Sequence, residues 1–508
     1  MLATVHSASL SGIESIAVEV QAFFGKGLPG VDIVGLGDTA VRESRVRVRS
    51  ALESSGLELP SRHVVLNLAP ADVRKSGSGL DLAIALALLC AGGVAAPSFL
   101  PELVVLGELA LGGELRAVRG VLSHLRAAEA RGFRRAIVPV ANVAEAQLVP
   151  GLDVRCAASL RDVVIHLRGD LELPRALTPT ACLPRSSSLD LSDVRGQYAA
   201  KRALEVAAAG NHNLLLVGPP GTGKSMLAQR LPTLLPRPSQ EEAIEIATIA
   251  SATGSPTPAR LSEVERPFRA PHHSLSAAAL VGGGNPIQPG EVTLAHGGVL
   301  FLDELPEFSR SSLECLRPTM ESGRALVART HERVELPARP LVVCAMNPCP
   351  CGYADDPRRL CMCPPDRVER YRTRISGPLL DRFDMHVALK PVEARILREG
   401  LAGDDSVTVR SRVEASRAWA RERAELGSGA SLAGPAADTD EDALRLLDRA
   451  VDALGLSARG YTKVLRVSRT IADLERAPRV GAQHVAEAIQ YRLLDRSRVE
   501  RGLATASG

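Results

Sequence analysis

The clearest chemical signal in the chain is an eight-residue segment with the spacing Gly-x-x-x-x-Gly-Lys-Ser. It comprises Gly218, Pro219, Pro220, Gly221, Thr222, Gly223, Lys224 and Ser225, with Met226 next. An apolar, strand-like run precedes it and a helical pattern follows. Glycines let the backbone N–H groups curve around phosphate oxygens, and the following helix adds its positive N-terminus. The pattern predicts ATP binding, with Lys224 on the β and γ phosphates and Ser225 on Mg²⁺.

Two adjacent acids supply the second half of such a site. Asp303 and Glu304 follow the continuously apolar run Val299 to Leu302, which is typical of a buried parallel strand. Ligands bind at the carboxyl ends of such strands. We therefore expect Asp303 to hold the hydrated Mg²⁺ and Glu304 to polarise the attacking water. An exposed acidic strand end is the alternative.

Phosphoryl transfer also needs groups that neutralise the γ-phosphate. Asn347 follows the apolar run Leu341 to Ala345 and suits the positioning of water against phosphate. Arg382 lies in the segment Ser376 to Asp384, and Arg466 lies in a helical pattern near the C-terminus. From spacing alone, each arginine is equally typical of a surface or ion-pair residue.

Four cysteines crowd into fifteen residues. Cys349 and Cys351 are separated by nine residues from Cys361 and Cys363. Four thiolates suffice for one tetrahedral metal, and the cluster predicts structural Zn²⁺, although C-x-C pairs are less common than C-x-x-C pairs. Four free thiols are the alternative.

The elements that must position these residues form several domains. A chain of 508 residues and 53.7 kDa suggests about three. Hydrophobic residues at 45% and charged residues at 23% exclude global disorder. We expect an α+β domain at residues 1–170, a linker at 171–190, an α/β core with a parallel sheet at 191–392, a connecting segment at 393–440 and a helical bundle at 441–508.

The composition also limits location and partners. The longest apolar run, Leu82 to Ala96, has fifteen residues and two glycines, whereas a membrane span needs about 20. We expect a buried helix there. No signal-peptide pattern begins the sequence, so we expect a cytoplasmic protein. The net charge of +3 says little about partners.

Several long segments resemble the Mg-chelatase-like AAA+ ATPases of the bacterial YifB/ComM type, over essentially the whole length. They are Gly218 to Ser225, Phe268 to His273, Leu280 to Gly284, Pro289 to Glu291, Leu294 to Leu305, Asn347 to Gly352 and Ser376 to Asp384. Val34 to Ser44 is similar to that family's Lon-protease-like domain.

The resemblance implies a ring, expected to be hexameric, with ATP between subunits. It assigns Asn347 as a polar sensor of the γ-phosphate, Arg382 as a finger donated to the neighbouring subunit's ATP, and Arg466 as a γ-phosphate contact. It further implies an insertion between Lys224 and Glu304.

A hairpin expected at Ala325 to Leu336 projects toward the pore in related motors. Its basic residues could contact DNA phosphates; they are Arg324, Arg329, His331 and Arg333. Glu321, Glu332 and Glu335 offset most of this charge, so a solvated hairpin is the alternative.

Three functions remain open after the ATPase assignment. The first is a DNA motor that drives branch migration in homologous recombination and natural transformation. The second is a magnesium-chelatase-type remodelling ATPase, and the third is a protein-remodelling or proteolytic ATPase. Lon-type peptidases use a serine and lysine pair, but Gly79 stands at the expected nucleophile position, beside Ser76 and Ser78. We therefore expect no peptidase activity.

Overall fold

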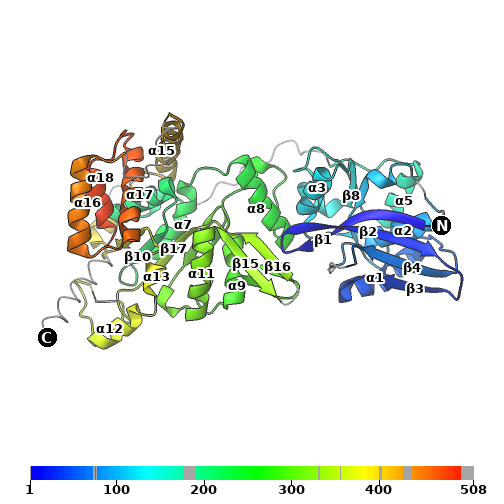
Figure 1. The fold of residues 1–508 in the computed structure, drawn as a ribbon, viewed down its shortest axis with the longest axis horizontal. Coiled ribbons are helices and arrows are strands. Elements are labelled where there is room, and N and C mark those ends of the chain that lie inside the picture. Colours follow the sequence, from blue (N-terminus) through cyan, green and yellow to red (C-terminus); the bar gives the residue numbers. More distant parts are fainter. Residues whose placement is uncertain are drawn as a thin grey trace.

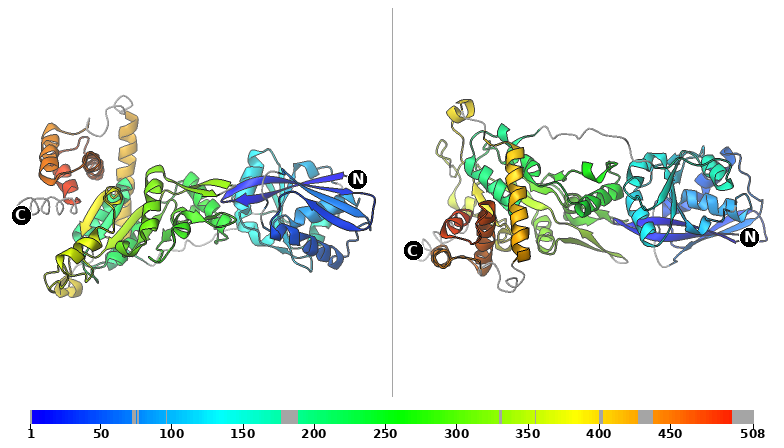
Figure 2. Two further views of the ribbon diagram at one scale, coloured as in Figure 1. Left: turned by 60° about the horizontal axis from the view of Figure 1, so that its bottom comes forward. Right: turned by 90° about the horizontal axis from the view of Figure 1, so that it is seen from above.

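The computed structural model is elongated, with three bodies in a row (Figure 1), and the two further views agree (Figure 2). A strand-rich N-terminal body lies at one end, a second α/β body lies in the middle, and helices α15 to α18 lie at the other end. The structure describes residues 2–71, 75, 77–95, 97–176, 189–329, 332–354, 356–399, 403–426 and 438–492.

The N-terminal body is built on a seven-stranded mixed sheet in the order β3-β4-β2-β1-β5-β8-β9. Its strands are β1 (Leu2–Ser11), β2 (Glu14–Phe24), β3 (Gly30–Val34), β4 (His63–Ala69), β5 (Leu103–Val105), β8 (Arg135–Pro139) and β9 (Asp153–Ala157), and a separate small hairpin pairs β6 (Glu108–Leu109) with β7 (Leu115–Arg116). Its helices are α1 (Thr39–Ser54), α2 (Asp81–Ala91), α3 (Val121–Ala130), α4 (Val143–Ala146) and α5 (Leu160–Arg168).

Helix α2 confirms the buried helix that the apolar run predicts. Every residue from Asp81 to Ala91 is buried. The helix is shorter than the apolar run, because the chain turns at Gly92 and at Gly93, whose φ is +80°. Among the described residues, no helix is long and apolar enough to cross a membrane.

The central body contains a five-stranded, fully parallel sheet in the order β11-β14-β17-β10-β18. These strands are β11 (Phe268–Arg269), β14 (Val299–Leu302), β17 (Leu341–Met346), β10 (Leu214–Val217) and β18 (Met385–Ala388). Two small hairpins accompany them: β12 (Gly282–Gly283) with β13 (Gln288–Pro289), and β15 (Arg324–Arg329) with β16 (Glu332–Pro337). The helices are α6 (Tyr198–Gly210), α7 (Lys224–Leu234), α8 (Gln240–Thr253), α9 (Ala277–Val281), α10 (Glu291–Leu294), α11 (Arg310–Ser322), α12 (Pro365–Arg372), α13 (Gly377–Leu380) and α14 (Ala394–Glu399).

Both faces of this sheet are covered, as expected for parallel strands with continuous apolar runs. Successive residues of a strand point to opposite faces. Leu214 and Leu216 therefore join an apolar cluster with the C-terminal helices, whereas Leu215 and Val217 join a second cluster on the other face.

The C-terminal helices are α15 (Ser406–Leu426), α16 (Glu441–Leu454), α17 (Ala458–Leu474) and α18 (Ala482–Gln490). The apolar side of α17 packs into the core shared with the central sheet, through Val464, Leu465, Val467 and Ile471. The predicted fold class, an AAA+ α/β core between an α+β domain and a helical bundle, is confirmed.

Helix α8 joins the N-terminal body to the central one. The backbone N–H of Gly120 donates to the Ser251 carbonyl (2.9 Å), and the N–H of Leu122 donates to Ser251 Oγ (3.2 Å). Ala243 and Ala247 of α8 pack into the apolar cluster around α3. This docking was not predicted from the sequence.

Parts of the predicted connections lie outside the described residues: 177–188 of the linker, 400–402 and 427–437 of the connecting segment, and the end of the chain from 493. The domain boundaries therefore stay predictions.

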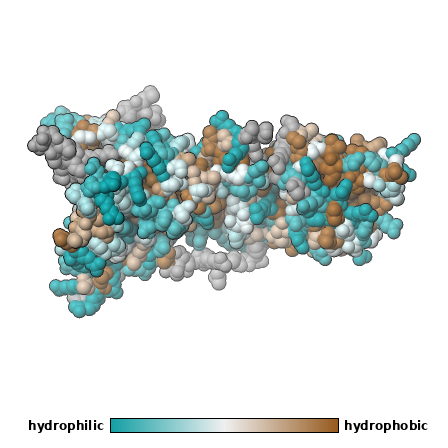
Figure 3. Space-filling view, turned by 90° about the horizontal axis from the view of Figure 1, so that it is seen from below, coloured by the Kyte–Doolittle hydropathy of each residue, from teal (hydrophilic) through white to brown (hydrophobic). Residues whose placement is uncertain are grey.

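In the space-filling view, apolar side chains gather on the N-terminal body, and the surface of the other bodies is mixed (Figure 3).

Candidate nucleotide site and cysteine cluster

The predicted phosphate loop connects β10 to α7. Gly221 and Gly223 have φ of +78° and +91°, a region that side chains other than hydrogen rarely allow. Thr222 Oγ1 donates to the Pro219 carbonyl (2.8 Å), and Gln197 Nε2 donates to the Thr222 carbonyl (2.9 Å). The loop is therefore curved, closed by a hydrogen bond within it and held from outside by Gln197, at the N-terminus of an eleven-residue helix.

Lys224 lies inside this curve. Its Nζ donates to the carbonyls of Gly218 (2.7 Å) and Pro219 (3.0 Å) and to Asn347 Oδ1 (3.0 Å). Burial lowers the pKa of Lys224, and the nearby carboxylate of Asp303 opposes that shift. The structure thus brings together the predicted lysine and the predicted sensor asparagine.

Ser225 faces the acids at the end of β14. Ser225 Oγ donates to Asp303 Oδ2 (2.7 Å). A hydroxyl and a carboxylate that converge beside the loop are hard oxygen ligands, which is the donor set that Mg²⁺ prefers. The residues present therefore fit a magnesium nucleotide.

Glu304 has a left-handed backbone, with φ of +53°. Its Oε2 lies 3.3 Å from His273 Nδ1, and its side chain is half exposed. His273 was not predicted as a site residue, although it belongs to the segment Phe268 to His273 on which the family resemblance rests. The sequence offers no spacing that links His273 to Glu304.

Three neighbouring strands carry these groups. β14, β17 and β10 are adjacent in the sheet, and Asp303, Asn347 and Gly218 each follow the last residue of one of them. Because the strands are parallel, their carboxyl ends meet at one edge. Residues 78 and 123 positions away from the loop are brought to it in this way.

The two predicted arginines are not brought to this edge within the protomer. Arg382 pairs with Glu321 of α11, and its Nε donates to the Arg317 carbonyl (3.3 Å). Arg466 Nη1 lies 4.0 Å from Asp384 Oδ1, and Asp384 Oδ2 accepts from the N–H of Asn213.

Asn213 immediately precedes β10, and Asp384 immediately precedes β18. The group formed by Asp384 and Arg466 is therefore at the amino-terminal edge of the sheet, opposite the phosphate loop. Arg466 therefore does not lie beside the phosphate loop of its own protomer.

The predicted hairpin is present as β15 and β16. Val327 and Val334 are buried, and Arg329 and Arg333 are exposed. Arg324 pairs with Glu335 (3.2 Å) across the strands. His331 lies outside the described residues. Val334 and Leu336 pack against Gly12, in the turn between β1 and β2 of the N-terminal body.

The position expected for a peptidase nucleophile carries no side chain. A Cβ at Gly79 would lie 2.9 Å from Val118 Cγ1. The neighbouring Ser78 Oγ donates to the carboxylate of Glu108, and Ser76 is not among the described residues. Lys75 is fully buried.

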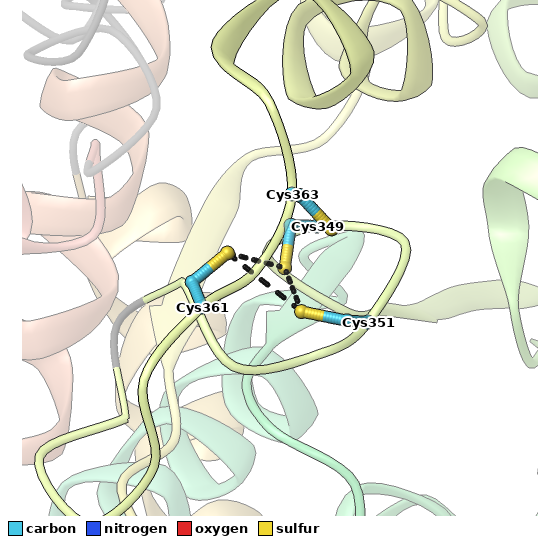
Figure 4. A group of neighbouring side chains, drawn as sticks. All are labelled: Cys349, Cys351, Cys361 and Cys363. Atoms are coloured by element: carbon cyan, nitrogen blue, oxygen red, sulfur yellow. Dashed lines mark hydrogen bonds between the residues drawn. The ribbon is translucent and has the colours of Figure 1, made fainter.

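The four cysteines of the predicted cluster converge (Figure 4). Their Sγ atoms all lie within 4.8 Å of one another. The Sγ of Cys349 is 3.3 Å from that of Cys351, and the Sγ of Cys361 is 3.7 Å from both. These separations exclude disulfides, whose sulfurs are about 2.05 Å apart. A hydrogen bond from the backbone N–H of Tyr353 lowers the pKa of Cys351 to about 6.

The parallel sheet with a phosphate loop after β10 and acids after β14 defines a P-loop fold of the AAA+ class. Three family descriptions match the chain: "Subunit ChlI of Mg-chelatase" at residues 18–142, "Magnesium chelatase, subunit ChlI" at 190–397, and "Magnesium chelatase, subunit ChlI C-terminal" at 403–492. Membership of this family implies the use of ATP and Mg²⁺.

Curated relatives narrow this class. The chain is 43% identical to the uncharacterized protein YifB of Escherichia coli over 97% of this chain and 98% of the relative. It is 41% identical to the competence protein ComM of Haemophilus influenzae over the same shares. It is 27% identical to the magnesium-chelatase 38 kDa subunit of Cereibacter sphaeroides over 62% of this chain and 97% of that subunit. The chain belongs to the Mg-chelatase-like YifB/ComM family.

Proposed function

We propose that the chain is a Mg²⁺-dependent ATPase that works as a homohexameric ring in the cytoplasm. We further propose that the ring moves DNA and drives branch migration during homologous recombination and natural transformation. The observation that carries the ATPase is the convergence of Lys224, Ser225, Asp303 and Asn347 at the carboxyl ends of three adjacent parallel strands.

Each of these residues has a role in this proposal. Lys224 contacts the β and γ phosphates, and Ser225 and Asp303 hold Mg²⁺ and its water shell. Glu304 orients and polarises the attacking water, and Asn347 positions that water against the γ-phosphate. Mg²⁺-ATP, when bound, supplies the phosphoanhydride bond that is cleaved.

In this proposal His273 orients the side chain of Glu304 at the end of β14. Its contact with Glu304 holds the carboxylate side chain in one direction. A carboxylate restrained in this way needs less reorganisation when it meets water.

The ring is supported by the distribution of the arginines. Arg382 and Arg466 lie far from the loop of their own protomer, yet hydrolysis needs positive charge beside the γ-phosphate. In a ring, a neighbouring protomer can supply it. Arg382 then exchanges its pairing with Glu321 for the neighbour's ATP.

DNA as the substrate is supported by the near full-length similarity to a protein named for competence. The exposed Arg329 and Arg333 of the β15–β16 hairpin suit contacts with phosphates. One structural Zn²⁺ in the cysteine cluster belongs to the same proposal.

A chelatase-type remodelling ATPase is the second candidate, favoured by the three matching family descriptions. The chelatase subunit spans only 62% of this chain. A ring that carries a large additional part is better suited to another partner than to the chelatase reaction.

ATP turnover tests these functions together. Forked or Holliday-type DNA should stimulate turnover and be displaced in an ATP-dependent manner, whereas protoporphyrin partners or unfolded protein should not stimulate it. Glu304→Gln should bind ATP and lose hydrolysis, by about 10²-fold or more. Glu441→Gln, an exposed carboxylate on α16 paired with Arg445, is the matched control. If unfolded protein and not DNA stimulates turnover, the chain is a protein-remodelling or proteolytic ATPase and not a DNA motor.

A further inference from the structure

The cysteine cluster is attached to the nucleotide site. Cys349 is two residues beyond Asn347 on the chain. Gly352, with φ of +86°, lies against the phosphate loop, because a Cβ there would be 2.6 Å from Pro220 Cδ. The loop that bears the thiols thus contacts Pro220 of the phosphate loop, and the neighbouring Asn347 accepts a hydrogen bond from Lys224 of the same loop.

The far end of this loop returns to the same place. Helix α12 begins at Pro365. Burial raises the pKa of its Tyr371 to about 12, and a hydrogen bond from the backbone N–H of Asn347 to the Tyr371 hydroxyl opposes that rise. Arg372 Nε donates to the Pro348 carbonyl (3.0 Å). The segment from Asn347 to Arg372 is therefore a closed excursion whose two ends meet beside the sensor asparagine.

Apart from the cysteines, a few polar contacts order the middle of this excursion: Arg358 Nη2 donates to the Val392 carbonyl (3.1 Å), and Arg359 Nη1 donates to the Tyr353 hydroxyl (2.8 Å). From Pro348 to Pro364 the described residues form no helix or strand. Its large apolar side chains point outward, since Leu360 is 85% exposed and Met362 is 81% exposed. Ordering an exposed, irregular segment of this length costs conformational entropy, and a cross-link between its cysteines would offset part of that cost.

The sulfur positions fit a single tetrahedral ion. A Zn–S bond of about 2.3 Å in a tetrahedron places sulfurs about 3.8 Å apart. The Sγ of Cys361 is 3.7 Å from those of Cys349 and Cys351, the Cys349–Cys351 separation is 3.3 Å, and all four sulfurs lie within 4.8 Å of one another. Backbone N–H groups also donate hydrogen bonds to the sulfurs of Cys349 and Cys351, as outer-shell donors do at thiolate sites; the donors are Tyr353, Ala354 and Met362.

We propose that Zn²⁺ bound by Cys349, Cys351, Cys361 and Cys363 stabilises the structure of the ATP site. The bound ion holds Asn347 beside Lys224 and keeps Gly352 packed against Pro220, a role that we call a brace. Four protein ligands leave no open coordination position, so the ion takes no part in the chemistry. The inference rests on the proposed ATPase function. In this inference Asn347 positions the attacking water, and the four cysteines are positioning residues that act only through Asn347.

The test compares the full chain with a Cys361→Ser/Cys363→Ser variant. Cys315→Ser is the matched control, because Cys315 is an exposed free cysteine on α11 outside the cluster. Metal analysis should find about one Zn²⁺ per protomer in the unaltered chain and in the control, and little in the double variant. Limited proteolysis should cut the double variant between residues 350 and 364 and spare the other two proteins.

Turnover separates a brace from a distant structural metal. The double variant should lose at least about tenfold in ATP turnover while it keeps its affinity for a fluorescent ATP analogue within a fewfold range. Because the metal acts through Asn347, combining the double variant with Asn347→Ala should lower turnover little beyond Asn347→Ala alone.

Three results would overturn the inference: unaltered protein without bound metal, a zinc-free variant with full turnover, or losses that multiply in the combined variant. If the unaltered chain hydrolyses no ATP, the proposed function fails, and metal content and proteolysis still report on the brace.

Discussion

Replacing Lys224 with Ala is expected to weaken ATP binding by roughly 30- to 150-fold, through the loss of about 2 to 3 kcal/mol. The size follows from the contacts of the ammonium group. Its hydrogen bonds go to two backbone carbonyls and to Asn347 Oδ1, all neutral acceptors. Contacts to phosphate oxygens would replace two of them, so that the charged donor would meet charged acceptors in place of neutral ones.

The two replacements determine the estimate. A hydrogen bond with a charged group contributes about 1.5 to 3 kcal/mol, and we place the bonds to neutral carbonyls at the low end of that range and those to phosphate at the high end, a gain of about 1 to 1.5 kcal/mol each. Two such gains give about 2 to 3 kcal/mol. Burial lowers the pKa of Lys224, and bound phosphates would raise it again, so the ammonium form is retained in the complex.

The assay is equilibrium titration of a fluorescent ATP analogue in the presence of Mg²⁺. Lys26→Ala removes the same charge from an exposed position of the N-terminal body and should bind like the unaltered chain. Unfolding of both variants without nucleotide checks that the fold is intact. An affinity of Lys224→Ala within about threefold of the unaltered chain would refute the assignment of the phosphate loop.

Two further predictions concern the ring and the pH response. Arg382→Ala should lower turnover by at least about 10³-fold and leave nucleotide binding intact; mixing it with Glu304→Gln subunits should restore part of the activity, and no recovery in verified mixed rings would argue against a finger given to the neighbour. Burial lowers the pKa of His124 to about 4, below the ordinary 6.5. Its contribution to stability is therefore present above pH 6.5 and is lost as the pH falls toward 4, by about 1.4 kcal/mol at pH 5.5. Denaturant unfolding of the N-terminal body at pH 7.5 and 5.5 measures this loss, which His124→Asn should reduce; equal losses in both proteins would contradict it.

The phosphate loop could be predicted from the sequence because its chemistry is local. Gly221 and Gly223 have to adopt a left-handed backbone, and Lys224 and Ser225 begin the next helix, so eight consecutive residues contain the feature. Continuous apolar runs likewise predicted buried parallel strands, since their side chains must be covered on both faces. The helical C-terminal part followed from apolar residues at helical spacing.

Other features depend on which strands are neighbours, and no local pattern contains that information. Asp303 and Asn347 reach the loop because β14, β17 and β10 are adjacent and parallel. The same topology puts Asp384 and Arg466 at the opposite edge of the sheet, away from the loop of their own protomer.

Tertiary packing also decided contacts that spacing could not reveal. His273 meets Glu304, Gly352 lies on Pro220, and Ser251 of α8 receives the backbone of α3. Each contact joins segments that are distant in the chain, and each depends on the docking of whole elements. The residue types came from the sequence, and the folded sheet and its packed loops determined which of them act together.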